Sequence, residues 1–420
     1  FDSLLVELET LARQQQVAAR KMAVLCEQSE SRIRDGEQLS GKADAIEERL
    51  GTFDRVAGAT RALDQGTLPS PTDIGTVLDE LEKSAEYLEA HYDFSGAQAH
   101  LQELAHQRHR ACLMVRGAVQ RSLEQSATQV ENEVWLQSDD GAVQTQVFYH
   151  AFNAGAQSCK QLSELLQQRV QRHKEYATAL EDLEVYYVDL RARLVAEPLG
   201  AHIRAVIGQS RNLSAGLRQV ASYILEVSGL EIQCFDAHFK KRQPQEALPG
   251  LLWRLGDSFQ QAVHSAVLAC TSLDALREAA EHLHAEFLEP RMHCSTPDAL
   301  TIPYAAVTRL HEVILERLVF QARAHIKKSI SAFTPMDQDL DYPACLLPAA
   351  ALGVQHAEKH VPRGSTVYHR GWFPTVDLTL GVLAKTYRAL EAPIFEGLAS
   401  EAIAACVGSL KQASEELASR

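Results

Sequence analysis

The sequence predicts an all-α fold, with a coiled-coil helix at the N-terminus followed by elongated helical-bundle rod domains. Three observations carry this prediction. The chain has only 22 glycines and 14 prolines in 420 residues, fewer than a turn-rich β protein needs. Apolar residues recur at helical spacing, and no short alternating segments mark the strands of a sheet. The apolar fraction of 46% is sufficient for a substantial core.

The first sixty residues carry the strongest periodic signal. Steps of four and three residues from Leu4 to Ala57 reach sixteen positions in one unbroken register, and twelve of them are apolar. We call these sixteen positions the seam. A seven-residue repeat places such a seam along one side of a helix, which suits a partner helix. Residues 1–65 are therefore predicted to be a coiled-coil assembly segment, in which the seam from Leu4 to Ala57 is about 80 Å long at 1.5 Å per residue.

The large apolar residues of the seam are the candidate contacts with partner subunits. They are Leu4, Leu8, Leu11, Met22, Leu25, Leu39, Ile46, Leu50 and Phe53. The polar interruption between Ser29 and Gly36 indicates a weak point or bend, since a mid-helix glycine costs about 1 kcal/mol relative to alanine. An alternative is a long amphipathic helix that folds back on its own chain and hides the seam there.

Breaks in the helical pattern divide the rest of the chain. A stretch rich in proline and glycine ends the first segment, and Thr72 or Asp73 is expected to cap the next helix. The expected segments are 66–136 (a second helical segment), 137–334 (a helical bundle after a linker at 137–141), 335–371 (an irregular connection) and 372–420 (the start of the next bundle). Helices within the last three segments are expected near 147–197, 199–241, 248–287, 299–333, 375–390 and 394–418, separated mostly at prolines such as Pro198.

Charge and cysteine usage exclude several classes of protein. The 41 basic and 55 acidic residues give a formal charge of −14, which opposes binding to nucleic acid. No uninterrupted run of 18 or more apolar residues occurs, so no transmembrane segment is expected. The eight cysteines form no C-x-x-C pair, which is typical of reduced thiols in a cytosolic protein. The chain begins without a basic and then apolar leader, so we expect no signal peptide.

Candidate catalytic and metal-binding motifs are weak. Residues 36–43 match G-x-x-x-x-G-K, but alanine replaces the serine or threonine that a phosphate-binding loop needs after the lysine. The pairs His106/His109 and His356/His360 could each share a helix face, but H-E-x-x-H and a third ligand are absent. The sequence contains no G-x-S-x-G elbow. We therefore predict a protein that is not an enzyme and has no cofactor.

Pairs of carboxylates spaced along single helices are a further candidate for acid–base chemistry. Examples are Glu82 with Glu86 and Glu181 with Glu184. We expect both pairs to lie on solvated helix faces, where nothing distinguishes them from ordinary surface charge.

Two motifs in the last third of the chain are distinctive. Residues 330–335 read I-S-A-F-T-P and are followed by D-L-D-Y-P at 339–343, and residues 371–376 read G-W-F-P-T-V. In both motifs the chain resembles the subunit 3 family of the conserved oligomeric Golgi complex. The run I-F-E-G-L at 394–398 continues the resemblance, which extends in order and spacing over nearly the whole chain.

The resemblance implies a place among the multisubunit tethering complexes. Their subunits are helical rods with N-terminal coiled-coil assembly segments, and they capture vesicles for retrograde traffic within the Golgi. The implied partners are sister subunits in a hetero-oligomer, with SNAREs, Rab GTPases, golgins and the COPI coat. The implied location is peripheral, on the cytosolic face of Golgi membranes.

Two hypotheses from different classes follow. In the first, the chain is a scaffold subunit of a tethering complex and joins sister subunits through the seam. In the second, it is a helical cytoskeletal or membrane-shaping scaffold protein that dimerises with itself through the same heptads. A stable homodimer in light scattering would favour the second.

Overall fold

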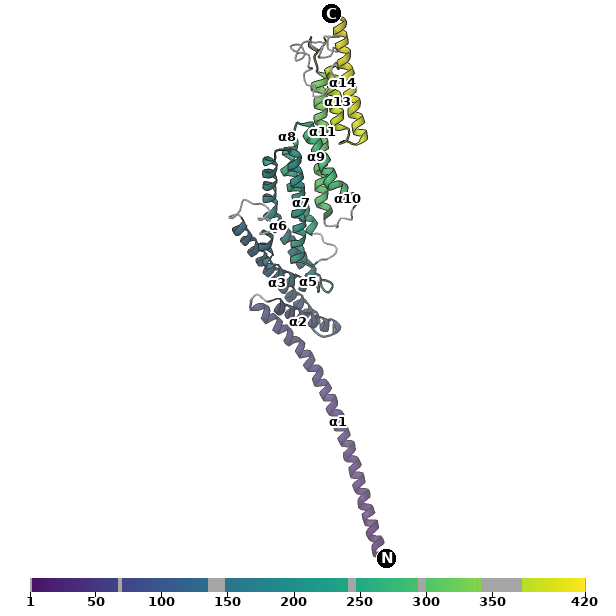
Figure 1. Ribbon diagram of the computed structural model, residues 1–420. Coiled ribbons are helices and arrows are strands. Elements are labelled where there is room, and N and C mark those ends of the chain that lie inside the picture. The colour runs from purple at the N-terminus through teal and green to yellow at the C-terminus, as the bar shows by residue number, and fades with distance from the viewer. Residues whose placement is uncertain are drawn as a thin grey trace. The chain divides into compact units, whose positions relative to one another are not determined.

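The computed structural model describes residues 2–66, 70–134, 148–240, 247–293, 300–337, 339–340 and 372–419. Helices joined by turns make up these residues, which contain no β-strand (Figure 1). The prediction of an all-α fold is thereby confirmed. The linker at 137–141, most of the connection at 335–371 and the pair His356/His360 lie outside the described residues.

The chain packs into two compact units, and we describe each by itself. Unit 1 comprises Phe1–Arg121 and Gln161–Leu180, and unit 2 comprises Ser122–Lys160 and Glu181–Arg420. These units cut across the segments expected from the sequence, because the end of the helix at 156–167 and the turn after it pack with the N-terminal helices.

Unit 1 contains α1 (Asp2–Asp64), α2 (Pro71–Ala90), most of α3 (Ala97–Val134), the end of α5 (Ala156–Gln167) and the start of α6 (Lys174–Gln209). Its core is formed by fully buried side chains on these helices, including Leu78, Leu81, Leu104, Val115, Leu166 and Tyr176. Helix α1 packs on α2 at its C-terminal end. The helix is continuous through Ser29–Gly36, where a weak point was predicted.

The N-cap of α2 differs from the prediction. The hydroxyl of Ser70 accepts a hydrogen bond from the backbone N–H of Asp73, and Pro71 occupies the first helical position. Proline suits that position because its missing N–H would have no partner there and its φ is already helical. The helix therefore starts two or three residues before Thr72 and Asp73 would have started it.

Unit 2 contains the remainder of α3, α5 and α6 together with the later helices. These are α7 (Leu213–His238), α8 (Ala247–Ala269), α9 (Leu273–Leu283), α10 (Glu289–His293), α11 (Thr301–His325), α13 (Pro374–Thr386) and α14 (Ala392–Ser419). A 3₁₀ turn, η1 (Asn153–Gly155), and two π-helical turns, η2 (His284–Leu288) and η4 (Ile326–Ser331), complete it. Helix α11 packs on α8 and α9, and α14 packs on η4 and α13.

The helices of unit 2 break at places other than those expected. Pro198 lies inside α6, although an interior proline costs about 3 kcal/mol. Buried residues on both sides of it, Val195 and Leu199 among them, keep the helix intact through packing. The chain breaks instead before Leu213, where the Asn212 side chain accepts a hydrogen bond from Ser214 N–H and caps α7. Ser272 caps α9 in the same way and divides the helix expected over 248–287.

A buried ion pair lies in the core of unit 2. The side chains of Arg191 and Glu231 are both completely buried, and Arg191 Nε donates to Glu231 Oε2 at 3.0 Å. Tyr149 OH donates to Glu231 Oε1 at 2.6 Å. The guanidinium also lies over the ring of Phe152, 4.3 Å from its centroid. His238 is in the same aromatic cluster, and burial lowers its pKa to about 4, so this imidazole is neutral near pH 7.

Helix α14 bears on the prediction of no transmembrane segment. In the part of the chain that the structure describes, it is the one helix with the length and apolar composition to cross a membrane. It also carries Glu396 and Glu401, and carboxylates within a membrane span are costly. One of its faces, which includes Leu398 and Ala402, is buried by packing within unit 2.

Candidate assembly surface on the first helix

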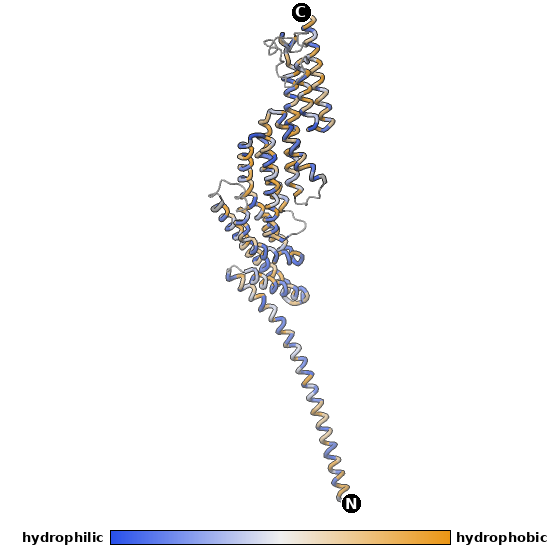
Figure 2. The backbone as a smooth tube through the Cα atoms, viewed as in Figure 1, coloured by the Kyte–Doolittle hydropathy of each residue, from blue (hydrophilic) through white to orange (hydrophobic). Residues whose placement is uncertain are grey.

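Most of α1 is exposed in the part of the chain that the structure describes. Every residue from 2 to 50 is exposed, and hydrophobic residues recur among hydrophilic ones along this stretch (Figure 2). Eight of the nine predicted contact residues, Leu4 to Leu50, lie here with exposed fractions of 55% to 65%. The structure therefore does not hide this part of the seam against the chain's own helices.

Phe53, the ninth predicted contact, is placed differently. Its ring lies edge-on to His100 of α3, with centroids 5.1 Å apart, and its exposed fraction is 38%. The seam is thus exposed up to residue 50, and from about residue 51 onward α1 packs against other helices of unit 1.

The C-terminal end of α1 is fixed to unit 1 by several contacts. Thr52, Ala59 and Leu63 are buried. The guanidinium of Arg49 lies 4.8 Å from the centroid of the Phe94 ring, and Arg110 Nη2 donates to Asp64 Oδ1 at 2.8 Å. The exposed part of the helix accordingly extends from a packed base.

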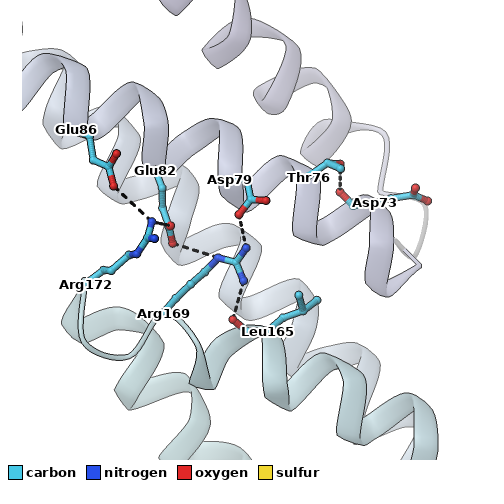
Figure 3. A network of polar contacts seen from close by, with 8 residues as sticks. All are labelled: Asp73, Thr76, Asp79, Glu82, Glu86, Leu165, Arg169 and Arg172. Atoms are coloured by element: carbon cyan, nitrogen blue, oxygen red, sulfur yellow. Dashed lines mark hydrogen bonds and ion pairs between the residues drawn. The ribbon is translucent and has the colours of Figure 1, made fainter.

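Two arginines that follow α5 hold α2 in place by ion pairs (Figure 3). Arg169 pairs with Asp79 and, at 3.2 Å from Nε, with Glu82, and it also donates to the backbone oxygen of Leu165. Arg172 pairs with Glu82 and, at 3.4 Å, with Glu86. Because α2 carries the end of α1, this network supports the base of the exposed helix.

The expectation that the carboxylate pairs lie on solvated faces is wrong for one member of each pair. The Glu82 side chain is only 3% exposed and lies between the two arginines. Glu184 is buried as well, whereas Glu181 is exposed. Sequence spacing could not reveal this, because the arginines lie about ninety positions from Glu82 in the chain.

The seam is accompanied by a second apolar column that the sequence analysis missed. If Leu4 takes heptad position d, the neighbouring position e is occupied by apolar or cysteine residues over the first half of the helix. They are Leu5, Ala12, Ala19, Cys26 and Ile33. From Ser40 onward the same column is polar. A face made of positions a, d and e is typical of helices in bundles, whereas a and d alone are typical of a two-helix seam.

A shallow depression lies on the exposed surface of α1. Leu8, Leu11, Ala12 and Gln15 line an open depression, together with Gln14 and Ala18. The first four residues have the spacing i, i+3, i+4 and i+7, which is the arrangement that receives one knob from a facing helix.

In the part of the chain that the structure describes, the motifs of other chemistries find no support. Residues 36–43 lie inside α1, so their backbone N–H groups are used by the helix and cannot cradle a phosphate. His106 and His109 are exposed on α3. Among the residues that the structure describes, no group of three or more His, Cys, Asp or Glu side chains is placed to hold a metal ion.

The two motifs that carried the resemblance meet in unit 2. Phe373, from G-W-F-P-T-V, lies edge-on to Phe333, with ring centroids 5.6 Å apart. Both belong to a small core cluster that also contains Leu340, Val376 and Ala413. These motif residues are therefore packing residues. The D-Y-P end of the other motif lies outside the described residues.

Comparison with known protein families decides the assignment. A family profile described as "Conserved oligomeric Golgi complex subunit 3, C-terminal" matches residues 145–420, and its N-terminal counterpart matches residues 1–125. The chain belongs to the conserved oligomeric Golgi complex subunit 3 family. The family resemblance seen in the sequence is confirmed.

Individual members of the conserved oligomeric Golgi complex subunit 3 family align over nearly the whole chain. The human protein is 25% identical over 459 aligned residues, covering 99% of this chain and 54% of its own length. The Drosophila melanogaster protein is 23% identical, with 98% and 49% coverage. The Dictyostelium discoideum protein is 35% identical over 119 residues, or 26% of this chain. The chain thus spans about half the length of these animal relatives, and no solved structure matches it significantly.

Proposed function

We propose that the protein is a subunit of a Golgi vesicle-tethering complex that acts in intra-Golgi retrograde transport. It serves as a scaffold without catalytic activity and is peripheral to the cytosolic face of Golgi membranes. Its direct partners are sister subunits, which bind the exposed part of α1, and the wider set is SNAREs, Rab GTPases, golgins and the COPI coat. Family membership supports the complex, and the exposed seam from Leu4 to Leu50 supports the mode of assembly.

The energetic basis of this assembly is burial of apolar surface. Covering one exposed leucine or isoleucine is worth about 1.5–3 kcal/mol. Association itself costs about 4–15 kcal/mol in lost translational and rotational freedom. Eight large apolar residues in one register, from Leu4 to Leu50, are therefore enough to support a stable complex once a partner helix covers them.

Substitutions in the seam test the proposal directly. The variant Leu25→Asp/Leu50→Asp is expected to weaken binding to sister subunits by roughly a thousandfold or more, because it removes apolar contacts and buries two unpaired charges. The measurement is co-purification of this chain with the other subunits of the complex after co-expression. Circular dichroism and thermal melting should show that the packed helices of both units remain folded.

A matched control lies on the same helix. Val17 and Val24 are exposed to a similar degree, at 51% and 52%, but occupy heptad position c, away from the seam. The variant Val17→Asp/Val24→Asp carries the same change in charge on the same helix, and we expect it to bind as the wild type does. Equal co-purification of both double variants and the wild type would overturn the proposal. The alternative, a homodimeric scaffold, is tested by light scattering of the purified wild type, in which a stable homodimer would favour it.

A further inference from the structure

The seam contains a single charged residue, Arg32, at heptad position d. The seam positions on either side of it are Ser29 and Gly36, and all three residues are exposed in the structure. Large apolar residues resume at Leu25 in one direction and Leu39 in the other. A guanidinium is thus placed in the middle of a surface that is otherwise buried on assembly.

Pairing of α1 with a second copy of itself brings two of these guanidinium groups together. In a parallel pair, equivalent d positions face each other, so Arg32 meets its own copy. In an antiparallel pair that overlaps over the whole seam from Leu4 to Ala57, Arg32 faces Ser29 of the other copy, and the two arginines are within one helical turn. Like charges in a desolvated seam repel strongly and select against that pairing.

Ion pairs between positions g and e of two copies do not offset this repulsion. In a parallel pair of copies, Lys42 would face Glu47, and Arg49 would face Asp54, because position g pairs with position e five residues on. These pairs lie at the rim, where ion pairs contribute little. In addition, Arg49 already lies over the Phe94 ring in unit 1.

The surroundings of Arg32 indicate what should face it. Ser29 and Gly36 are small residues, one at each of the seam positions next to Arg32. The seam is therefore locally shallow, with room for a side chain that reaches in from a facing helix. A buried guanidinium needs a carboxylate as its partner, because only that group neutralises the charge and accepts its hydrogen bonds.

We propose that Arg32 selects a heterologous partner, namely a helix of a sister subunit that places an aspartate or glutamate opposite it, and that it prevents α1 from pairing with itself. This inference rests on the proposed function and specifies the chemistry of the partner. Polar residues within coiled-coil seams are known to set partner choice and register at some cost in stability.

Two substitutions of Arg32 distinguish partner selection by charge from non-specific apolar association. Arg32→Glu reverses the charge and is expected to weaken co-purification with the sister subunit by about tenfold or more. Arg32→Leu removes the one charge from the seam and is expected to strengthen self-association by about tenfold or more, seen as a concentration-dependent dimer in light scattering. Arg34→Glu, two residues away at the outward position f, makes the same charge change and should have neither effect.

The facing residue can be found with the same assay. Each of the other subunits of the complex is co-expressed with the Arg32→Glu variant, and its helical aspartates and glutamates are replaced one at a time by lysine. Restored binding by one such replacement supports the inference. The inference is overturned if Arg32→Glu binds as tightly as Arg34→Glu, or if no replacement restores binding. If Leu25→Asp/Leu50→Asp abolishes binding while Arg32→Glu does not, the proposed function stands without the inference.

Discussion

Replacing Glu231 with glutamine is expected to lower the free energy of unfolding of unit 2 by about 3–5 kcal/mol, the usual cost of removing one partner of a buried ion pair. Arg191 would then remain in the core with no charge to compensate it. Burial alone lowers the pKa of Arg191, but the carboxylate of Glu231 raises it, and the net shift is upward. Arginine stays protonated in proteins even without a partner, so the variant keeps a charged guanidinium in an apolar core. Chemical denaturation followed by circular dichroism measures the effect.

Two further variants define the origin of that loss. Glu124→Gln also alters a carboxylate that accepts a hydrogen bond from a tyrosine, Tyr186, but this pair is exposed, so we expect a change within about 0.5 kcal/mol. The triple variant Arg191→Met/Glu231→Leu/Tyr149→Phe removes all the polar partners together and should be more stable than Glu231→Gln alone. Wild-type stability of Glu231→Gln would show that the ion pair is not the determinant.

The substitution Arg169→Met is expected to destabilise unit 1 by about 2–4 kcal/mol, because it deprives the nearly buried carboxylate of Glu82 of one of its two arginines. Hydrogen exchange should report the loss as faster exchange of the backbone amides of α2. The neighbouring Arg172 has a side chain that is 53% exposed. Arg172→Met is therefore the matched control, with an expected loss of about 1 kcal/mol or less. Equal effects of the two variants would contradict the assignment of Arg169 as the structural arginine.

The sequence was sufficient for features that depend on local periodicity. The heptads of α1 predicted a helix with one apolar stripe, and the structure has that helix with the stripe exposed from Leu4 to Leu50. Its continuity through Ser29–Gly36 was not predicted, since local propensity treats a glycine among polar residues as a weak point. The start of α2 was displaced for a related reason: several residues in succession could cap it, and Ser70 does so.

Features that depend on contacts between distant residues could not be predicted. Pro198 has the local signature of a helix end, and only packing of its flanks keeps α6 intact. The ion pairs of Glu82 and Glu231 join positions about ninety and forty residues apart, and no spacing in the sequence links them. The apolar column from Leu5 to Ile33 was visible in the sequence, but it was missed because the heptad analysis followed only two of the seven positions.

The exposed stripe of α1 has a consequence for the abundance of the protein in the cell. Under the proposed assembly, a copy that has not yet bound a sister subunit exposes leucines, and chaperones and proteases act on such incompletely assembled chains. Binding of a sister subunit would cover these leucines and stabilise the folded chain by mass action. We expect its abundance to follow that of the scarcest partner, so that depletion of one gene product lowers the level of another whose own synthesis is unchanged.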